Sequence, residues 1–343
     1  MSEGLWSGFN LINALAARAN GAFPPYVTGI SIDTRTIEPG DLFFAIKGEN
    51  SDGHDYVRTA VEKNAAACVI DEVHADSLKG IGAQFIVRDV LASLESLARA
   101  SRARSSAGIV GVTGSVGKTG TKEMLKLALS HFGPTHASAA SYNNHWGVPL
   151  TLARMSEDTR YGVFEIGMNH AGEITVLVDM VRPHVAIITT IAPVHLEAFN
   201  SVDDIARAKA EIFTGLEPHG VAIVHRDVKQ FELLRSAARA TRAAQVLSFG
   251  DSDQADARLV SVEPDGEGSL VEAWLLGQTL KFKLGAPGRH IAMNSLAVLL
   301  GARALGVDPA DAAQTLAEFK PPSGRGARQT LNLPGGNFVL IDD

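Results

Sequence analysis

The sequence predicts an α/β protein of more than one domain, built around a mostly parallel β-sheet. From Gly108 onward, unbroken apolar runs rich in β-branched residues alternate with amphipathic stretches, as in parallel strands covered on both faces. A length of 343 residues also exceeds one ordinary hydrophobic core. We therefore expect a small N-terminal α/β domain over residues 1–105, a central parallel-sheet domain over 106–320, and a hinge with a further strand over 321–343.

The expected elements follow from hydrophobic patterning and turn residues. In the first domain, short strand-like runs lie at 27–32, 42–46, 67–70 and 84–87. In the central domain, strand-like runs lie at 108–113, 161–166, 185–190 and 220–224, and helix-like stretches lie at 117–132 and 201–216. Alternating runs at 257–262, 269–275 and 279–284 predict a β-meander, which two helices over about 291–319 follow. Pro321 and Pro322 cannot continue a helix, so they mark a hinge before the last strand-like run at 335–343.

Composition excludes several classes of function. The formal net charge is -7, and no block of Lys and Arg is interleaved with aromatic residues, so we expect no nucleic-acid surface. The sequence contains no run of about 18 apolar residues, so it predicts no membrane-spanning helix. The first residues lack the basic and apolar regions of a secretory signal, so the sequence indicates a cytoplasmic location. The single cysteine, Cys68, lies in an apolar run and is expected to be a buried structural thiol.

The glycine-rich turn predicts a phosphate-binding loop. Gly111, Gly117, Lys118 and Thr119 fit the pattern G-x-x-x-x-G-K-[ST], and they lie between an expected strand and an expected helix. Backbone N–H groups of such a loop surround phosphate oxygens, and the helix N-terminus favours negative charge. Lys118 would reach the outer phosphates, and the Thr119 hydroxyl would bind Mg²⁺. The expected ligand is a nucleoside triphosphate, which makes the central domain P-loop ATPase-like.

Two further residues, Glu165 and His195, are candidates for the same sheet edge, and a third, Lys209, lies in an expected helix. Glu165 ends the strand-like run at 161–166, so its carboxylate is expected beside the loop, as a magnesium ligand or as a capping or solvated acid. His195 follows the run at 185–190, but a loop histidine by itself is unremarkable. Lys209, taken alone, would be a solvated helix lysine.

Seven ordered blocks carry a family resemblance. They are "SIDTRTIEPGDLFFAIKGENSDGHDYV" at 31–57, "GVTGSVGKTGTKEM" at 111–124, "SYNNHWGVPLTL" at 141–152, "FEIGMNHAGEI" at 164–174, "AKAEIF" at 208–213, "GAPGRHIAMNSLAVL" at 285–299 and "GRGARQ" at 324–329. Together they resemble the Mur ligases, the ATP-dependent amide-forming family of peptidoglycan assembly. The "NNHWGVPLTL" and "EIGMNHAGEI" stretches resemble the branch that adds D-Ala-D-Ala to UDP-MurNAc-tripeptide.

The resemblance implies roles for individual residues. Catalytic roles fall on Lys118, Glu165, His195 and Lys209, and Mg²⁺ ligation on Thr119, Glu165, His195 and Lys209. Carbamylation of Lys209 would convert this cation into an anionic oxygen ligand. ATP contacts are implied for Gly114, Ser115, Val116, Gly117, Lys118, Thr119, Gly120, His290, Asn294 and Arg325. Contacts to the UDP end of the substrate are implied for Ser31, Thr34 and Arg35, and contacts along the muramoyl peptide for Asn143 and Asn144.

The chain departs from the family pattern at three places. Gly120 stands in a run that is usually threonine, and Ile291 replaces a polar residue after His290. Family members also continue into a further Rossmann-like domain, of which this chain holds only the hinge and first strand at 321–343. The resemblance implies small-molecule substrates, UDP-MurNAc-tripeptide and D-Ala-D-Ala, and a monomeric state.

Three functional interpretations remain open at this point. The first is a D-Ala-D-Ala-adding ligase that forms an acyl phosphate from ATP and a carboxylate. The second is a module that binds ATP and a UDP-sugar without turnover. The third is a related ligase, of the MurE or folylpolyglutamate synthase type, which shares the phosphate loop and is expected to differ in the block at 141–152.

Overall fold

The computed structural model describes residues 4–139, 141–194, 197–322, 327–333 and 336–342, with backbone only beyond residue 322. His195 and Arg325 therefore lie outside the described residues. The chain forms two compact units. The first contains residues up to Ser106 and the segment Asn144–Thr159, and the second contains Ala107–Asn143 and everything from Arg160 onward.

The first unit is a small α/β body. Its five-stranded sheet has the order β2-β7-β6-β5-β4, in which only β2 runs antiparallel to its neighbour. The strands are β2 Arg18–Asn20, β4 Gly29–Ser31, β5 Asp41–Phe44, β6 Ala67–Asp71 and β7 Gln84–Val87. A two-stranded ribbon pairs β1 Trp6–Ser7 with β3 Tyr26–Val27. The helices are α1 Gly8–Leu15, η1 Gly53–Tyr56, α2 Val57–Glu62, α3 Val90–Arg104 and α5 Gly147–Ala153.

Helix α5 belongs to the first unit although it is far along the chain. All seven of its residues are buried, and it packs on α3. Leu150 and Ala153 join the same apolar cluster as Phe44 and Leu97. The Trp6 indole donates a hydrogen bond of 2.9 Å to the carbonyl of Ala153. Tertiary packing thus places residues 144–159 with the first unit, whereas the sequence prediction had put them in the central domain.

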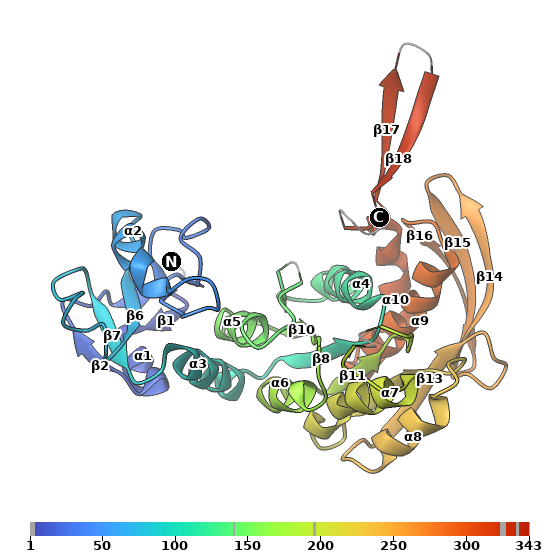
Figure 1. The fold of residues 1–343 in the computed structure, drawn as a ribbon. Helices are drawn as coiled ribbons and strands as arrows, with labels where there is room; N and C mark the ends of the chain where they lie inside the picture. Colours follow the sequence, from blue (N-terminus) through green and yellow to red (C-terminus); the bar gives the residue numbers. More distant parts are fainter. Residues whose placement is uncertain (1–3, 140, 195–196, 323–326, 334–335, 343) are drawn as a thin grey trace. The chain divides into compact units, whose positions relative to one another are not determined.

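The second unit is built on a nine-stranded sheet of order β16-β15-β14-β13-β12-β11-β8-β10-β9 (Figure 1). From β9 to β14 neighbouring strands are parallel, and β14, β15 and β16 form an antiparallel meander. The strands are β8 Gly108–Thr113, β9 Thr135–Ala137, β10 Tyr161–Glu165, β11 Val185–Ile188, β12 Val221–His225, β13 Gln245–Gly250, β14 Ala257–Asp265, β15 Gly268–Leu275 and β16 Gln278–Leu284. The expected α/β fold and the expected meander are both confirmed.

Helices cover both faces of this sheet (Figure 1). Helices α4 Lys118–Ser130, α9 Arg289–Ala304 and α10 Pro309–Thr315 cover one face, where they share a cluster of buried apolar residues with the central strands. Helices α6 Glu173–Val181, α7 Val202–Ala210 and α8 Phe231–Arg239 cover the other face, with the 3₁₀ turn η2 Glu211–Gly215. The 3₁₀ turn η3 Leu316–Glu318 packs with α10 and α4 on the first face. The central strands β10 and β11 are buried at every residue, which explains their unbroken apolar sequences. The last two strands, β17 Ala327–Leu333 and β18 Gly336–Asp342, form an antiparallel hairpin.

Candidate nucleotide-binding site

The predicted phosphate loop connects β8 to α4. Gly114 and Gly117 have φ angles of 149° and 87°, which favour glycine. A Cβ at Gly114 would overlap the Thr189 hydroxyl, and one at Gly117 would lie 2.5 Å from the Asn294 amide nitrogen. Both the backbone conformation and the close neighbours therefore require glycine at these two positions.

The loop is fixed by the segment that follows β11. The Ser115 backbone N–H donates to the Thr190 carbonyl at 2.9 Å, and the Ser115 hydroxyl donates to the Ala192 carbonyl at 3.1 Å. The Thr189 hydroxyl donates to the Val116 carbonyl at 2.6 Å. The N-cap residue of α4 is Gly117, so no N-cap side chain competes with an anion for the positive end of this helix. The arrangement is that of a rigid phosphate cradle.

Two lysines lie near the loop, and their charge states differ. Lys118 Nζ donates to the Gly114 carbonyl at 2.8 Å and so lies across the loop. Lys209, in α7, is only 2% exposed, so the interpretation as a solvated helix lysine is wrong. Burial, and secondly the charge of Lys118, lower the pKa of Lys209 to about 7. The structure thus brings Lys209 within electrostatic reach of the loop, and a large share of it is a neutral amine at neutral pH.

Glu165 ends β10 next to β8, at the carboxyl edge of the parallel sheet. Glu165 pairs with Val112 of β8. Val112 lies one residue before Thr113, the last residue of β8, and the phosphate loop begins directly after that residue. Glu165 is 1% exposed, and its Oε1 accepts a 2.7 Å hydrogen bond from Asn143 Nδ2. Its Oε2 is buried and has no hydrogen-bond partner among the described residues. A buried carboxylate oxygen without a donor is the kind of atom that a divalent cation would satisfy.

Buried polar atoms without partners concentrate at this edge. In the part of the chain that the structure describes, six side-chain N or O atoms are buried without a hydrogen-bond partner. Five of them belong to Thr113, Thr121, Glu165 and both ring nitrogens of His225, which are residues of β8, α4, β10 and β12. Since buried polar groups in native proteins are nearly always satisfied, the clustering indicates a ligand site.

His225, Thr113 and Thr121 were not predicted as site residues from the sequence. His225 ends β12, its ring stacks on Phe249 with centroids 4.9 Å apart, and its Nε2 lies 3.6 Å from Asp227 Oδ2, beyond hydrogen-bond distance. Burial lowers the pKa of His225, although Asp227 and Asp251 raise it in part, so burial favours the neutral form of the ring. The signal that could have identified it is its position, because it ends an apolar run at the same sheet edge as Glu165.

Helix α9 carries the two predicted residues from the block at 285–299. Asn294 is half-buried against Gly117 of the loop, and His290 is exposed in the first turn of α9. Arg289 pairs with Asp251, which follows β13, and so ties the start of α9 to the sheet. The structure therefore brings Asn294 to the loop.

Three predicted substrate residues of the first unit lie at the end of β4 and just after it, and a fourth, Asn144, lies at the start of α5. The Ser31 hydroxyl is buried, donating to the Asp33 carbonyl at 2.9 Å and accepting from the Asp33 N–H at 3.2 Å. Arg35 is exposed and pairs with Asp33 at 2.6 Å, and the Thr34 carbonyl accepts from Lys63 Nζ. Asn144 Oδ1 accepts from the N–H groups of Trp146 and Gly147 and so caps the start of α5.

A second group of titratable side chains, in the first unit, has a different character. His54 Nδ1 lies 2.6 Å from Asp52 Oδ1, and His54 Nε2 accepts from the Asp71 N–H at 3.1 Å. The rings of His54 and His74 stack with centroids 3.9 Å apart at 13°. Ring nitrogens bind metals in the plane of the ring, and one ion cannot lie in both of these planes. The group, which we call the histidine cluster (Asp52, His54, Asp71 and His74), is a satisfied hydrogen-bond network.

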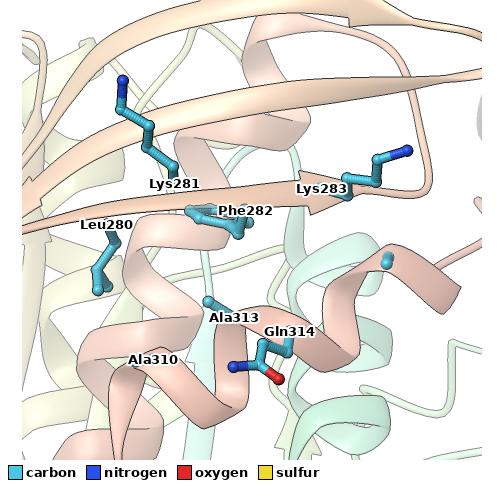
Figure 2. Close-up of a pocket in the computed structure, with 8 residues that line it drawn as sticks. Leu280, Lys281, Phe282, Lys283, Ala310, Ala313 and Gln314 are labelled. Atoms are coloured by element: carbon cyan, nitrogen blue, oxygen red, sulfur yellow. The ribbon is translucent and has the colours of Figure 1, made fainter.

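A groove of about 350 Å³ lies between the edge strand β16 and α10 (Figure 2). Leu280 and Phe282 point toward α10, and Lys281 and Lys283 point away from it (Figure 2). Lys281 pairs with Glu272 at 3.1 Å and Lys283 with Asp265 at 2.8 Å. Lysines on an edge strand oppose the addition of another strand, so we interpret this groove as a protected sheet edge.

The fold and the cradle define a nucleotide-binding α/β protein of the P-loop class. Comparison with known families makes this more specific. Residues 112–302 match the Mur ligase middle domain, and residues 26–102 match the catalytic domain of the Mur ligase family. The chain belongs to the Mur ligase family.

Individual relatives agree with this assignment. The chain is 35% identical to the UDP-N-acetylmuramoyl-tripeptide--D-alanyl-D-alanine ligase of Rickettsia prowazekii, over 90% of the chain and 68% of the relative. It is 33% identical to the Escherichia coli ligase of the same name, over 92% of the chain and 68% of that ligase. The chain thus spans about two thirds of the length of these relatives.

Solved structures show the same likeness. MurF from Acinetobacter baumannii superposes with a TM-score of 0.85 at 30% identity, over 98% of this chain and 72% of that one. The MurF ligase from Thermotoga maritima in complex with ADP superposes with a TM-score of 0.74 at 27% identity, over 92% of this chain and 70% of that one. Folylpolyglutamate synthase of Mycobacterium tuberculosis shares the fold alone, with a TM-score of 0.58 at 17% identity, over 69% of this chain and 64% of that one.

Among the described residues, none of the helices is both long and apolar enough to cross a bilayer.

Proposed function

We propose that this chain is the UDP-substrate- and ATP-binding part of a ligase that joins D-Ala-D-Ala to UDP-MurNAc-tripeptide. The observation that carries the proposal is the phosphate cradle with the unpaired Glu165 oxygen at the same sheet edge, in a chain 35% identical to a ligase of that name. The 30% identity to MurF over 98% of the chain favours this branch over the folylpolyglutamate synthase type.

ATP would bind with its phosphates in the cradle. The backbone N–H groups from Gly114 to Gly120 and the positive end of α4 would hold the phosphate oxygens. Lys118 would exchange its bond to the Gly114 carbonyl for a phosphate oxygen. Asn294, which lies against Gly117, and His290 and Arg325 are proposed to contact the rest of the nucleotide and its phosphates.

The residues at the edge fit a magnesium ion. Thr119 follows Lys118 in the loop, and Glu165 offers the unpaired Oε2. We propose these two as ligands, with His195 and Lys209 completing the metal sites. Bound magnesium would neutralise phosphate charge and polarise the phosphoryl group. Hard oxygen ligands of this kind are those that Mg²⁺ prefers.

Carbamylation of Lys209 is the second proposed feature of the metal site. Its pKa of about 7 leaves much of the buried amine neutral, and a neutral amine attacks CO₂. The reaction forms an N–C bond, releases one proton and leaves a carbamate anion. Loss of ligase activity in Lys209→Ala, with recovery on addition of a short carboxylic acid, would support this modification. The absence of recovery would contradict it.

The reaction would proceed in two displacements. A carboxylate oxygen of the tripeptide attacks the γ-phosphorus of ATP, and the bond to the β,γ-bridging oxygen breaks to release ADP. The amine of D-Ala-D-Ala then attacks the acyl phosphate carbon, loses a proton and expels inorganic phosphate. Lys118 would offset the repulsion between the carboxylate and the triphosphate. Ser31, Thr34 and Arg35 of the first unit are proposed to meet the UDP end of the substrate. Asn143 of the second unit and Asn144 of the first are proposed to contact the muramoyl peptide.

The test is product formation by the 343-residue chain. Mg-ATP, UDP-MurNAc-tripeptide and D-Ala-D-Ala are supplied together and then omitted one at a time, while phosphate release and product mass are measured. Product that requires all three supports the proposed ligase in full. Binding of ATP and the UDP-tripeptide without product supports the binding module, and no ATP binding contradicts both interpretations. We also propose that the chain acts as a cytoplasmic monomer, which gel filtration with light scattering would check.

A further inference from the structure

The two oxygens of the Glu165 carboxylate have different surroundings. Oε1 accepts a hydrogen bond of 2.7 Å from the side-chain amide of Asn143, and Oε2 is buried without a partner among the described residues. The side chain is almost fully enclosed, so neither oxygen has free access to bulk water. Asn143 therefore occupies one oxygen and leaves the other for a different ligand.

The position of Asn143 is itself closely determined. The Gly167 N–H, two residues beyond Glu165, donates to the Asn143 carbonyl at 2.8 Å, and the Asn143 N–H donates to the Ser141 carbonyl at 2.8 Å. A Cβ at Gly167 would lie 2.9 Å from Asn143 Oδ1, so a side chain there would displace the amide. The backbone on both sides of this contact thus holds the amide against the end of β10.

Ser138 anchors the same segment from the other side. Its hydroxyl accepts from the Glu165 N–H at 3.3 Å, and its carbonyl accepts from Lys122 Nζ at 2.8 Å. Lys122 is completely buried in α4, the helix that begins with Lys118 of the cradle. The segment that carries Asn143 is therefore connected both to Glu165 and to the phosphate-binding helix.

We infer that Asn143 is a positioning residue that fixes the Glu165 carboxylate so that Oε2 is directed to a divalent cation. A neutral amide suits this role, because it orients the carboxylate without cancelling the negative charge that attracts the cation, as Lys or Arg would. The inference rests on the proposed function. It differs from the substrate contact proposed for Asn143, which would change the affinity for the UDP-tripeptide and not for the metal.

The experiment measures Mn²⁺ binding to the 343-residue chain saturated with a non-hydrolysable ATP analogue, by electron paramagnetic resonance. Asn143→Leu removes the donor at similar size, and Asn143→Ala is a second, smaller variant. Glu165→Gln removes the proposed ligand. Gln230→Leu is the matched control, because Gln230 donates to Asp203 at 2.9 Å in another amide–carboxylate pair of the same unit. Analogue affinity in EDTA and the thermal midpoint are measured for each variant.

We expect the Asn143 variants to raise the Mn²⁺ dissociation constant about 10- to 100-fold, the usual effect of losing a residue that orients a metal ligand. Metal-free analogue affinity should stay within about threefold, since the cradle is untouched, and Gln230→Leu should match the wild type. In the Glu165→Gln background, Asn143→Leu should have no further effect, because Asn143 acts only through Glu165. A merely structural role would weaken analogue and metal binding together.

Each contrary outcome has a distinct meaning. Wild-type Mn²⁺ affinity in both Asn143 variants, with Glu165→Gln impaired, overturns this inference alone. A further loss in the double variant also overturns it, because Asn143 would then act independently of Glu165. Wild-type Mn²⁺ affinity in Glu165→Gln overturns the proposed metal ligand and the inference together. Failure of the wild-type chain to bind the analogue overturns the proposed function itself.

Discussion

The two units treat their buried polar groups in opposite ways. In the first unit, such groups are paired with one another: His54 uses both ring nitrogens, and Gln84 donates to two carbonyls. Its one unpaired buried side-chain atom among the described residues is Arg104 Nε, whose guanidinium lies 3.4 Å over the Trp6 ring. In the described part of the second unit, five unpaired atoms collect at one sheet edge. Closed networks indicate structural roles, and unpaired groups gathered together indicate a ligand.

The largest expected effect tests the proposed ligand site of the second unit. Lys118→Ala should reduce ATP affinity at least about 100-fold, because the charge-assisted contact to the outer phosphates is lost. The unfolding free energy should change little, since the Lys118 Nζ hydrogen bond described above goes to a loop carbonyl and not to the core. Isothermal titration calorimetry would measure the affinity. Lys126→Ala, an exposed lysine of the same helix, is the control. Unchanged affinity in Lys118→Ala would remove the central assignment.

The next largest effect tests the structural role of the histidine cluster in the first unit. His54→Ala should lower the unfolding free energy of the first unit by about 2–4 kcal/mol, because it leaves the Asp71 N–H unsatisfied and removes the stacked ring. Nucleotide affinity should not change. Trp6 and Trp146 lie in the first unit and Trp274 in the second, so urea unfolding of the Trp274→Phe background reports the first unit by fluorescence. A metal-binding role would instead show as destabilisation by chelators in the wild type.

How far the sequence could predict these features depends on how local each signal is. The cradle was predictable because its glycines, Lys118 and flanking elements are contiguous. Glu165 was predictable because it ends an apolar strand. The burial of Lys209 was not predictable from the residue alone, because a lysine is almost never fully buried. Asn143 meets Glu165 across 22 residues, and no residue pattern marks that contact.

Helix α5 shows the same limit at the level of the fold. Its seven residues, GVPLTLA, contain Pro149 and no polar face, so no amphipathic period marks them as helical. Its assignment to the first unit depends on packing against α3, which only the folded chain shows. The boundary between the units was predicted near residue 105, and the first segment does end at Ser106. The return of residues 144–159 to that unit is a tertiary effect.

A smaller effect concerns how the contribution of Asp52 to the stability of the first unit depends on pH. Burial alone would raise the pKa of Asp52, but hydrogen bonds from the backbone and ring of His54 lower it below the ordinary value. A lowered folded-state pKa means that the stabilisation is complete above the unfolded value, about 3.9, and is lost as pH falls through the folded value. Asp52→Asn should therefore lower the unfolding free energy of the first unit by roughly 1 kcal/mol at pH 7.

The measurement is urea unfolding at a series of pH values. The difference between Asp52→Asn and the wild type should shrink as pH falls below about 4, where the wild-type carboxylate takes up its proton. Asp55→Asn, a change to an exposed acid of the same 3₁₀ turn, is the control. A difference that stays constant with pH would mean that Asp52 stabilises the histidine cluster without its charge.

The smallest effect lies within the cradle and separates its two kinds of glycine. Gly120 has an ordinary helical conformation, and a Cβ there would meet nothing within 4 Å. Gly120→Ala should therefore stabilise the second unit by about 0.5–1 kcal/mol through helix propensity. Gly117→Ala, by contrast, combines a φ of 87° with a contact to Asn294 and should weaken ATP binding. Thermal unfolding and calorimetry of both variants would check this, and equal losses of ATP affinity would mean that the cradle needs open space beside Gly120 as well.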